Sequence, residues 1–159
     1  MVLYLDIDGV MVPANSWRRP EILEDGFPNF SEKASKSLNR ILSVSSADIV
    51  LTTSHKHNYS LSEWKKIFLR RNILVNKISR LPKNTQYFSR KEELVKWFTN
   101  HKSNEDFLII DDDKSLNDLP LNLKEHLLQT SGSVGLTDQL AEEGLAKLAK
   151  GLKKKIEQS

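Results

Sequence analysis

The chain has 159 residues, 38% of them hydrophobic and 28% charged, a composition typical of a globular protein with one domain. It contains no cysteine, which excludes disulfides and thiolate metal sites. No apolar run is long enough to span a bilayer, and the first residues do not resemble a secretory signal. We therefore expect a cytoplasmic protein with no membrane partner.

The net charge of +3 is unevenly distributed. Residues 147–159 contain five lysines and one glutamate, so the remainder of the chain is slightly acidic. A basic segment of this kind either contacts nucleic acid or forms a solvated helix end that interacts favourably with the helix dipole. We favour the second interpretation and expect one domain over residues 1–146, followed by a basic helical tail.

Hydrophobic segments alternate with segments of helical periodicity, which predicts an α/β fold with a mostly parallel sheet. The first strand is expected at Val2–Asp6. Residues 11–30 contain three prolines and one glycine, and we expect them to form a small loop-rich lid over the strand ends. Apolar residues at helical spacing follow, namely Ala34, Leu38, Ile41 and Leu42.

The rest of the chain repeats this alternation. The further strands are expected at Asp48–Thr53, around Ile73–Ile78, at Asp106–Asp111 and at His126–Thr130. The helices between and after them are expected at Leu61–Phe68, from a capping box at Ser89–Glu92, and from Thr137 to about Lys155. These elements predict a five-stranded, doubly wound, Rossmann-like sheet with helices on both faces.

Two carboxylates follow the first strand in the sequence Asp6-Ile7-Asp8-Gly9-Val10. In an extended chain, positions 6 and 8 point to the same face, at the sheet edge where open α/β folds bind ligands. Two neighbouring anions repel each other unless a cation or a shared proton intervenes. Because Mg²⁺ prefers carboxylate and phosphate oxygens, the motif predicts a Mg²⁺ site in which one acid attacks a substrate and the other transfers a proton.

Three other polar clusters lie at the ends of predicted elements. Thr53 and Ser54 end the second strand, a basic pair at positions 90 and 91 begins a helix, and acids at positions 111–113 end the fourth strand. The carboxyl ends of parallel strands meet at one edge of a sheet, so the strand-end clusters should converge there. Each cluster alone is common in proteins, whereas their order is not.

This order resembles the haloacid dehalogenase superfamily, whose members are mostly Mg²⁺-dependent phosphatases. The first superfamily motif is matched by Asp6 to Val10, the second by the strand ending in Thr53, the third by Arg90 or Lys91, and the fourth by Asp111 and Asp112. The run Thr53-Ser54-His55-Lys56 also looks like the Ser/Thr-Ser-Trp-Arg of small domains of this superfamily found alone or inside RNA-repair proteins. In this chain His55 and Lys56 replace that Trp and Arg.

The resemblance implies a role for each acid. Asp6 would be the nucleophile that forms an aspartyl-phosphate, and Asp8 would be the general acid and base. Mg²⁺ would be held by the Asp6 carboxylate, the Asp8 backbone carbonyl and Asp112. Asp111 is also expected among the metal-binding residues, and it would steady the basic residue that neutralises the phosphate. The motif spacing does not separate Arg90 from Lys91 in that role, so both are retained.

The resemblance also implies which residues bind the substrate. The Thr53 hydroxyl and the Ser54 backbone N–H would contact the phosphoryl oxygens, and Gly9 and Lys56 complete the expected set. Arg18, in the lid, would grip a second phosphate or a polyanion. The two histidines that flank Lys56 either contact substrate or lie on a hydrated loop, and we do not assign them to metal.

The expected substrate is a phosphomonoester, and a small lid leaves the cleft open to a large one such as a nucleic-acid end or a nucleotide. A receiver-like signalling domain fits poorly, because its phospho-acceptor Asp would stand where this chain has Thr53 and Ser54. The alternative is a non-catalytic domain of the same fold that binds nucleic acid or a protein partner. We favour the enzyme because every motif position is filled.

Overall fold

The computed structural model describes residues 1–14 and 19–158. Five parallel strands form one sheet in the order β3-β2-β1-β4-β5. The strands are β1 Val2–Leu5, β2 Asp48–Leu51, β3 Ile78–Arg80, β4 Phe107–Asp111 and β5 Leu127–Gln129. The α-helices are α1 Glu32–Ser45, α2 Leu61–Arg70, α3 Arg90–Asn100, α4 Leu121–Lys124 and α5 Asp138–Gln158, and a 3-10 helix, η1, covers Lys114–Asp118.

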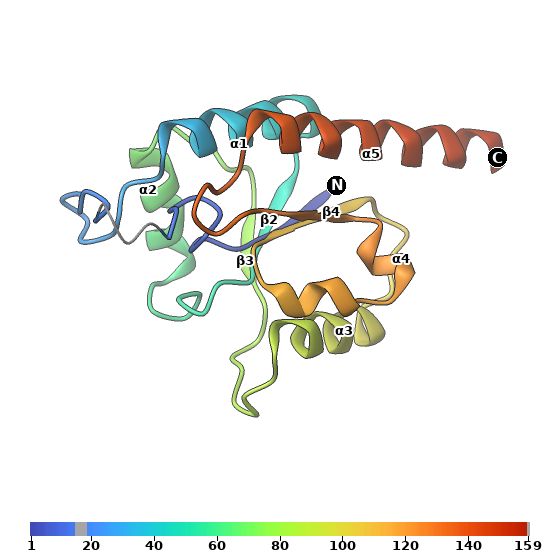
Figure 1. Ribbon diagram of the computed structural model, residues 1–159, viewed down its shortest axis with the longest axis horizontal. Helices are drawn as coiled ribbons and strands as arrows, with labels where there is room; N and C mark the ends of the chain where they lie inside the picture. Colours follow the sequence, from blue (N-terminus) through green and yellow to red (C-terminus); the bar gives the residue numbers. More distant parts are fainter. Residues whose placement is uncertain (15–18, 159) are drawn as a thin grey trace.

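The sheet lies between two layers of helices. Helices α1 and α5 run side by side over one face, and α3 and α4 cover the other (Figure 1). Successive strand residues point to opposite faces, so each strand contributes to both hydrophobic cores. Leu3 and Leu5 of β1 pack into the core that contains α1, while Tyr4 packs into the core beneath α3. The predicted doubly wound α/β fold is confirmed.

The third strand lies later in the chain than the sequence predicts. The apolar run from Ile73 to Ile78 suggested a strand, but β3 begins only at Ile78, which pairs with Ile49 of β2. Because β2 is only four residues long, residues before 78 have little strand to pair with. Ile73 and Val75 are instead buried in the core as part of the loop that leads into β3.

Serine side chains set the starts of three helices. The Ser31 hydroxyl accepts a hydrogen bond from the Ala34 N–H at the start of α1. Ser60 and Ser89 form capping boxes with Glu63 and Glu92 at the starts of α2 and α3. Each cap satisfies backbone N–H groups that have no partner within the helix. The cap at Ser89 therefore places Arg90 at the first position of α3, at the rim of the sheet.

Residues 19–30 of the lid are anchored to the end of α2 by Arg71. The Arg71 guanidinium lies 2.7 Å from a carboxylate oxygen of Asp25 and donates hydrogen bonds to the carbonyls of Phe27 and Pro28. Its side chain is buried, and the rings of Phe27 and Phe30 contact it. This anchor fixes Phe27 against the loop that follows β2.

The basic segment expected as a tail is, up to residue 158, the second half of α5, which runs on past the sheet (Figure 1). Two of its lysines reach back to the domain. The Lys147 ammonium donates to the carbonyl of Glu125, and that of Lys155 lies 3.2 Å from a carboxylate oxygen of Asp106. Gly144 lets this helix approach β5 closely, because a Cβ there would overlap the Leu128 side chain.

Within residues 1–14 and 19–158, no helix combines the length and the apolar character that crossing a membrane requires.

Candidate active site

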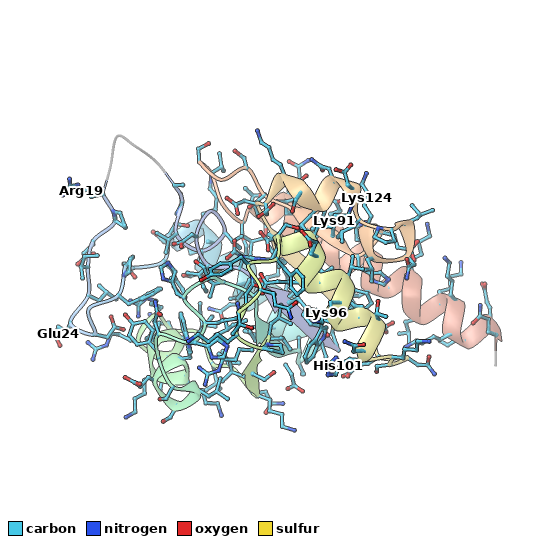
Figure 2. The ribbon with its side chains drawn as sticks, turned by 90° about the horizontal axis from the view of Figure 1, so that it is seen from below. Arg19, Glu24, Lys91, Lys96, His101 and Lys124 are labelled. Atoms are coloured by element: carbon cyan, nitrogen blue, oxygen red, sulfur yellow. The ribbon has the colours of Figure 1, made fainter. Side chains whose placement is uncertain are left out.

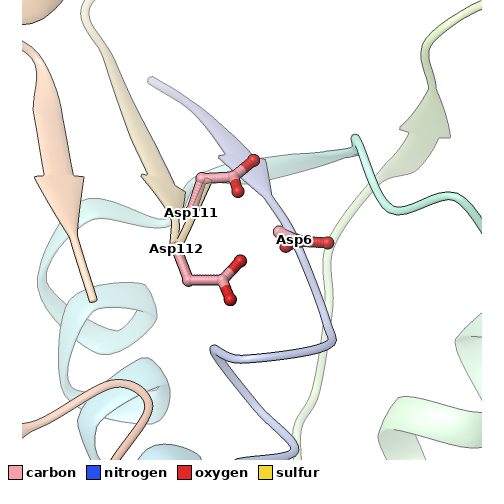
Figure 3. Close-up of side chains that lie close together, drawn as sticks. All are labelled: Asp6, Asp111 and Asp112. Carbon is pink, nitrogen blue, oxygen red and sulfur yellow. The ribbon is translucent and has the colours of Figure 1, made fainter. Parts of the chain in front are cut away.

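The polar residues gather where the direction of winding changes. From β1 the chain proceeds to β2 and β3 on one side, then crosses to β4 and β5 on the other. Adjacent strands β1 and β4 are therefore followed by connections that run in opposite directions. Such a switch point leaves a crevice outside the carboxyl ends of the two strands, where open α/β sheets bind ligands. Asp6 follows β1, Asp111 ends β4, and Asp112 follows β4 at this point (Figure 3).

Three carboxylates converge at this edge of the sheet. One oxygen each from Asp6, Asp111 and Asp112 lie within 4.8 Å of one another. Asp6 and Asp111 are buried, and Asp112 is partly buried. The Asp6 Oδ1 atom accepts a hydrogen bond from the Ile7 N–H at 2.9 Å, which fixes the orientation of that side chain. The three carboxylates offer only oxygen atoms as metal ligands, and oxygen is the ligand type that a hard cation such as Mg²⁺ requires.

The electrostatics of Asp6 reflect this crowding. Burial and repulsion by Asp111 raise the pKa of Asp6 to about 9, while Arg90 partly opposes the shift. In the absence of a cation, the Asp6 carboxyl group is therefore mostly protonated at neutral pH. A divalent cation between the three carboxylates would remove the repulsion and favour the ionised form. The residues present thus fit a Mg²⁺ site.

Gly9 makes room for this cluster. Its φ angle is +78°, in the left-handed region that favours glycine, and a Cβ at this position would overlap the Asp112 carboxylate. A Cβ on Gly132, in the loop after β5, would also be close to that carboxylate, at 2.9 Å. Asp112 is therefore held between two glycine backbones. The structure places Gly9, expected to bind substrate, in contact with the Asp112 side chain.

The structure separates the two candidates for the basic residue. The Arg90 Nη1 atom lies 2.6 Å from Asp111 Oδ2, 3.6 Å from Asp6 Oδ1 and 3.2 Å from the hydroxyl of Thr52. Burial alone would lower the pKa of Arg90, but the surrounding carboxylates raise it, so the guanidinium stays charged. Lys91 instead lines a surface hollow that Phe88 and Lys96 also line, and Figure 2 shows it at the start of α3. Arg90 is thus the member of the pair at the acidic cluster.

Glu93 links Arg90 to Lys56 in an arrangement that the sequence analysis missed. One Glu93 oxygen lies 3.7 Å from Arg90 Nε, and the other accepts a hydrogen bond from Lys56 Nζ at 3.3 Å. All three side chains are largely buried. The available sequence signal was the spacing of three between Arg90 and Glu93, which places both on one side of a helix's first turn. Lys56, expected to bind substrate, is paired here with a carboxylate.

Asp8 has a different environment from Asp6. We expected both carboxylates on one face of an extended strand, but β1 ends at Leu5 and the two side chains have different partners. The Asp8 side chain is 56% exposed, and its Oδ2 atom lies 2.7 Å from Nε2 of His55. The cluster of three carboxylates within 4.8 Å consists of Asp6, Asp111 and Asp112 and does not include Asp8. Asp8 therefore lies at the open mouth of the site, where it can meet solvent and substrate.

The two threonines after β2 are both buried. The Thr52 hydroxyl accepts a hydrogen bond from Arg90, and that of Thr53 accepts one from the His55 backbone N–H at 3.3 Å. Ser54 is exposed at the rim, where its backbone N–H can meet a ligand. Arg18, expected in the lid, lies outside the described residues.

The profile of a protein family described as "HAD domain in Swiss Army Knife RNA repair proteins" matches residues 2–141, which is most of the chain. The chain belongs to this family. This HAD domain thus has the α/β fold that its sequence indicated, and its acidic cluster lies at the carboxyl ends of β1 and β4. A search of curated protein sequences found no match to this chain.

Proposed function

We propose that this HAD domain is a Mg²⁺-dependent phosphohydrolase that acts through an aspartyl-phosphate on Asp6. The observation that carries the proposal is the convergence of Asp6, Asp111 and Asp112 within 4.8 Å, with the Arg90 guanidinium in contact with two of them. This arrangement combines a carboxylate nucleophile, a set of oxygen ligands for a hard cation, and a buried positive charge. Phosphoryl transfer needs little more than such positioning and charge stabilisation.

In the first step an Asp6 carboxylate oxygen attacks the phosphorus atom, and the bond from phosphorus to the leaving oxygen breaks. Asp8 donates a proton to that leaving oxygen. In the second step Asp8 accepts a proton from a water molecule that attacks the aspartyl-phosphate, which releases phosphate and restores Asp6. The exposure of Asp8 suits this role, because it must meet both the leaving group and water.

The surrounding residues serve the same reaction. Arg90 offsets the charge of the nucleophile and of the incoming phosphate, and Asp111 holds Arg90 in place at 2.6 Å. The Thr53 hydroxyl and the Ser54 backbone N–H are positioned after β2 to donate to phosphoryl oxygens. Mg²⁺, held by Asp6 and Asp112 and assisted by the Asp8 carbonyl, would shield the nucleophile from the anionic phosphate.

We further propose that the substrate is a phosphorylated nucleic-acid end. The family to which the chain belongs is described by its occurrence in RNA repair proteins. The mouth of the site is compatible with a large substrate, since Asp8 and Ser54 are exposed there. The phosphorylated end of an oligonucleotide can reach Asp8 while the rest of the oligonucleotide stays outside the site.

The test is Mg²⁺-dependent release of inorganic phosphate from a panel of phosphomonoesters. The panel contains p-nitrophenyl phosphate, mononucleotides, sugar phosphates and oligonucleotides with a 3′- or a 5′-phosphate. Wild type, Asp6→Asn and Asp118→Asn are compared with and without EDTA. Asp118→Asn makes the same chemical change on an exposed residue of η1, so it controls for the loss of one carboxylate.

We expect release by wild type and Asp118→Asn that EDTA abolishes and that Asp6→Asn lacks, with oligonucleotides preferred. A preference for another member of the panel would contradict the substrate class and leave the reaction intact. Folded wild type that releases no phosphate from any substrate would contradict the enzymatic proposal and favour a binding domain of the same fold.

A further inference from the structure

We infer that His55 is a positioning residue for Asp8. This inference rests on the proposed function, in which Asp8 donates a proton to the leaving group. The His55 Nε2 atom lies 2.7 Å from Asp8 Oδ2, which is short for a hydrogen bond from nitrogen to oxygen. Asp8 is more than half exposed and would otherwise be free to change rotamer. The contact therefore fixes a side chain that the reaction requires in one orientation.

The second ring nitrogen of His55 defines which tautomer makes this contact. The Asn58 amide nitrogen lies 3.2 Å from His55 Nδ1. An amide NH₂ can only donate, so Nδ1 is the acceptor, and the neutral ring carries its hydrogen on Nε2. That hydrogen points at Asp8 Oδ2. Asn58 thus maintains His55 as a donor to Asp8.

The ring itself is held by its surroundings. The Phe27 ring meets it edge to face, with the ring centroids 6.3 Å apart. The His55 backbone N–H donates to the Thr53 hydroxyl, and the Asn58 N–H donates to the His55 carbonyl at 2.9 Å. The lid and the loop after β2 therefore position His55 together.

A hydrogen bond to Oδ2 has a direct chemical consequence for Asp8. With Oδ2 occupied as an acceptor, the proton that Asp8 delivers is carried by Oδ1. During the first step this Oδ1–H bond breaks as the bond from hydrogen to the leaving oxygen forms, and the resulting carboxylate keeps its hydrogen bond from His55. Correct orientation of a proton donor is a large part of its effect, because misplacement by about 1 Å can cost about 10²-fold in rate.

The test compares two substrates that differ in their need for a proton donor. The p-nitrophenolate ion leaves readily without protonation, whereas the alkoxide of an aliphatic ester such as glycerol 2-phosphate does not. The value of kcat/KM reports the steps up to phosphoryl transfer, and it is measured for both substrates. The His55→Phe variant keeps a ring against Phe27 but has no donor.

We expect His55→Phe to lower kcat/KM by about 10²-fold for glycerol 2-phosphate and by less than about threefold for p-nitrophenyl phosphate. His55→Gln retains an N–H donor of similar reach and should recover activity on the aliphatic ester to within about tenfold of wild type. His57→Phe is the matched control, because the His57 ring contacts the Leu81 carbonyl and should leave both values unchanged. Adding His55→Phe to Asp8→Asn should cause no further loss, since the two residues act as a unit.

Equal losses on both substrates, or a full additional loss in the double variant, would show that His55 has a merely structural role and would overturn the inference. An unchanged His55→Phe would overturn it as well. Wild type that releases phosphate neither from these two esters nor from the phosphorylated oligonucleotides would instead refute the proposed function itself, and the positioning role with it. The wild-type measurement therefore separates failure of the proposed function from failure of the inference.

Discussion

We expect Asp6→Asn to stabilise the folded protein at neutral pH when divalent cations are absent, although it abolishes the proposed activity. The substitution keeps the size of the side chain and removes one negative charge from a buried cluster of three carboxylates. Substitution of a residue that serves function at the expense of stability is expected to stabilise the fold while it removes activity. Mg²⁺ should reduce this difference, because the cation stabilises the wild-type cluster.

The distances indicate the size of the effect. At an effective dielectric constant of about 20, Asp111 and Asp112, each within 4.8 Å, would repel an ionised Asp6 by about 3.5 kcal/mol apiece. Arg90, at 3.6 Å, would attract it by about 4.6 kcal/mol. Repulsion therefore exceeds attraction by about 2 kcal/mol, and the cost of burying the charge adds to it.

The raised pKa of Asp6 converts this imbalance into a dependence on pH. Between about pH 4 and pH 9 the unfolded chain has an ionised Asp6 and the folded protein a protonated one, so unfolding releases a proton. The stability of the folded protein therefore falls as pH rises, by about 1.4 kcal/mol per unit. Over pH 5 to 8 the loss is about 4 kcal/mol, and Asp6→Asn should not show it.

The assay is urea unfolding of wild type, Asp6→Asn and Asp118→Asn at several pH values between 5 and 8. One series contains EDTA and the other contains saturating Mg²⁺. In EDTA, Asp6→Asn should be the most stable of the three at pH 8 and close to wild type at pH 5. Mg²⁺ at 100 times its dissociation constant should stabilise wild type by about 2.7 kcal/mol and should stabilise Asp6→Asn much less.

Two results would refute this reasoning. One is a dependence of unfolding free energy on pH that is the same in wild type and Asp6→Asn, which would mean that Asp6 is not a strained acid. The other is an equal stabilisation of both proteins by Mg²⁺, which would mean that Asp6 takes no part in holding the cation.

Two further predictions concern neighbours of Asp6. Arg90→Met leaves the fully buried Asp111 carboxylate without its partner and should lower the unfolding free energy, measured in urea, by about 3 to 5 kcal/mol. Lys91→Met should change the unfolding free energy by about 0.5 kcal/mol or less. Similar losses in the two variants would contradict the contact of Arg90 with Asp111. Gly9 and Gly26 share a φ of +78°, but a Cβ would meet Asp112 at Gly9 and open space at Gly26. Gly26→Ala should therefore lower the unfolding free energy by about 1 kcal/mol, and Gly9→Ala should lower it by about 2 kcal/mol more. Only Gly9→Ala should weaken Mg²⁺ binding in a calorimetric titration. Equal effects of the two substitutions on stability and on Mg²⁺ binding would exclude the contact between Gly9 and Asp112.

The sequence alone was sufficient to predict the α/β fold and the position of the acids in it. Hydrophobic runs ending in Asp6 and Asp111 are local signals, because each strand and the residue that follows it are contiguous in the chain. The capping box at Ser89 was equally readable, since its two partners are three residues apart. These features depend on short-range geometry, which the order of residues determines directly.

The third strand shows where local patterns are insufficient. Residues Ile73 to Ile78 have the composition of a strand, but pairing with β2 decides where β3 begins. Ile73 and Val75 are apolar because they fill the core. A buried loop position and a buried strand position both favour apolar residues, so the sequence pattern does not distinguish them.

The partners of the site residues were decided by tertiary structure. Arg90 and Lys91 are adjacent in sequence and both basic, but about 100° of rotation along a helix separates their directions, and Arg90 is the one that contacts the carboxylates. The contacts of Asp8 with His55 and of Lys56 with Glu93 join residues 47 and 37 positions apart. Such contacts depend on how the loops that follow different strands pack at one edge of the sheet. The periodicity of a single sequence does not indicate which residues of those loops come into contact.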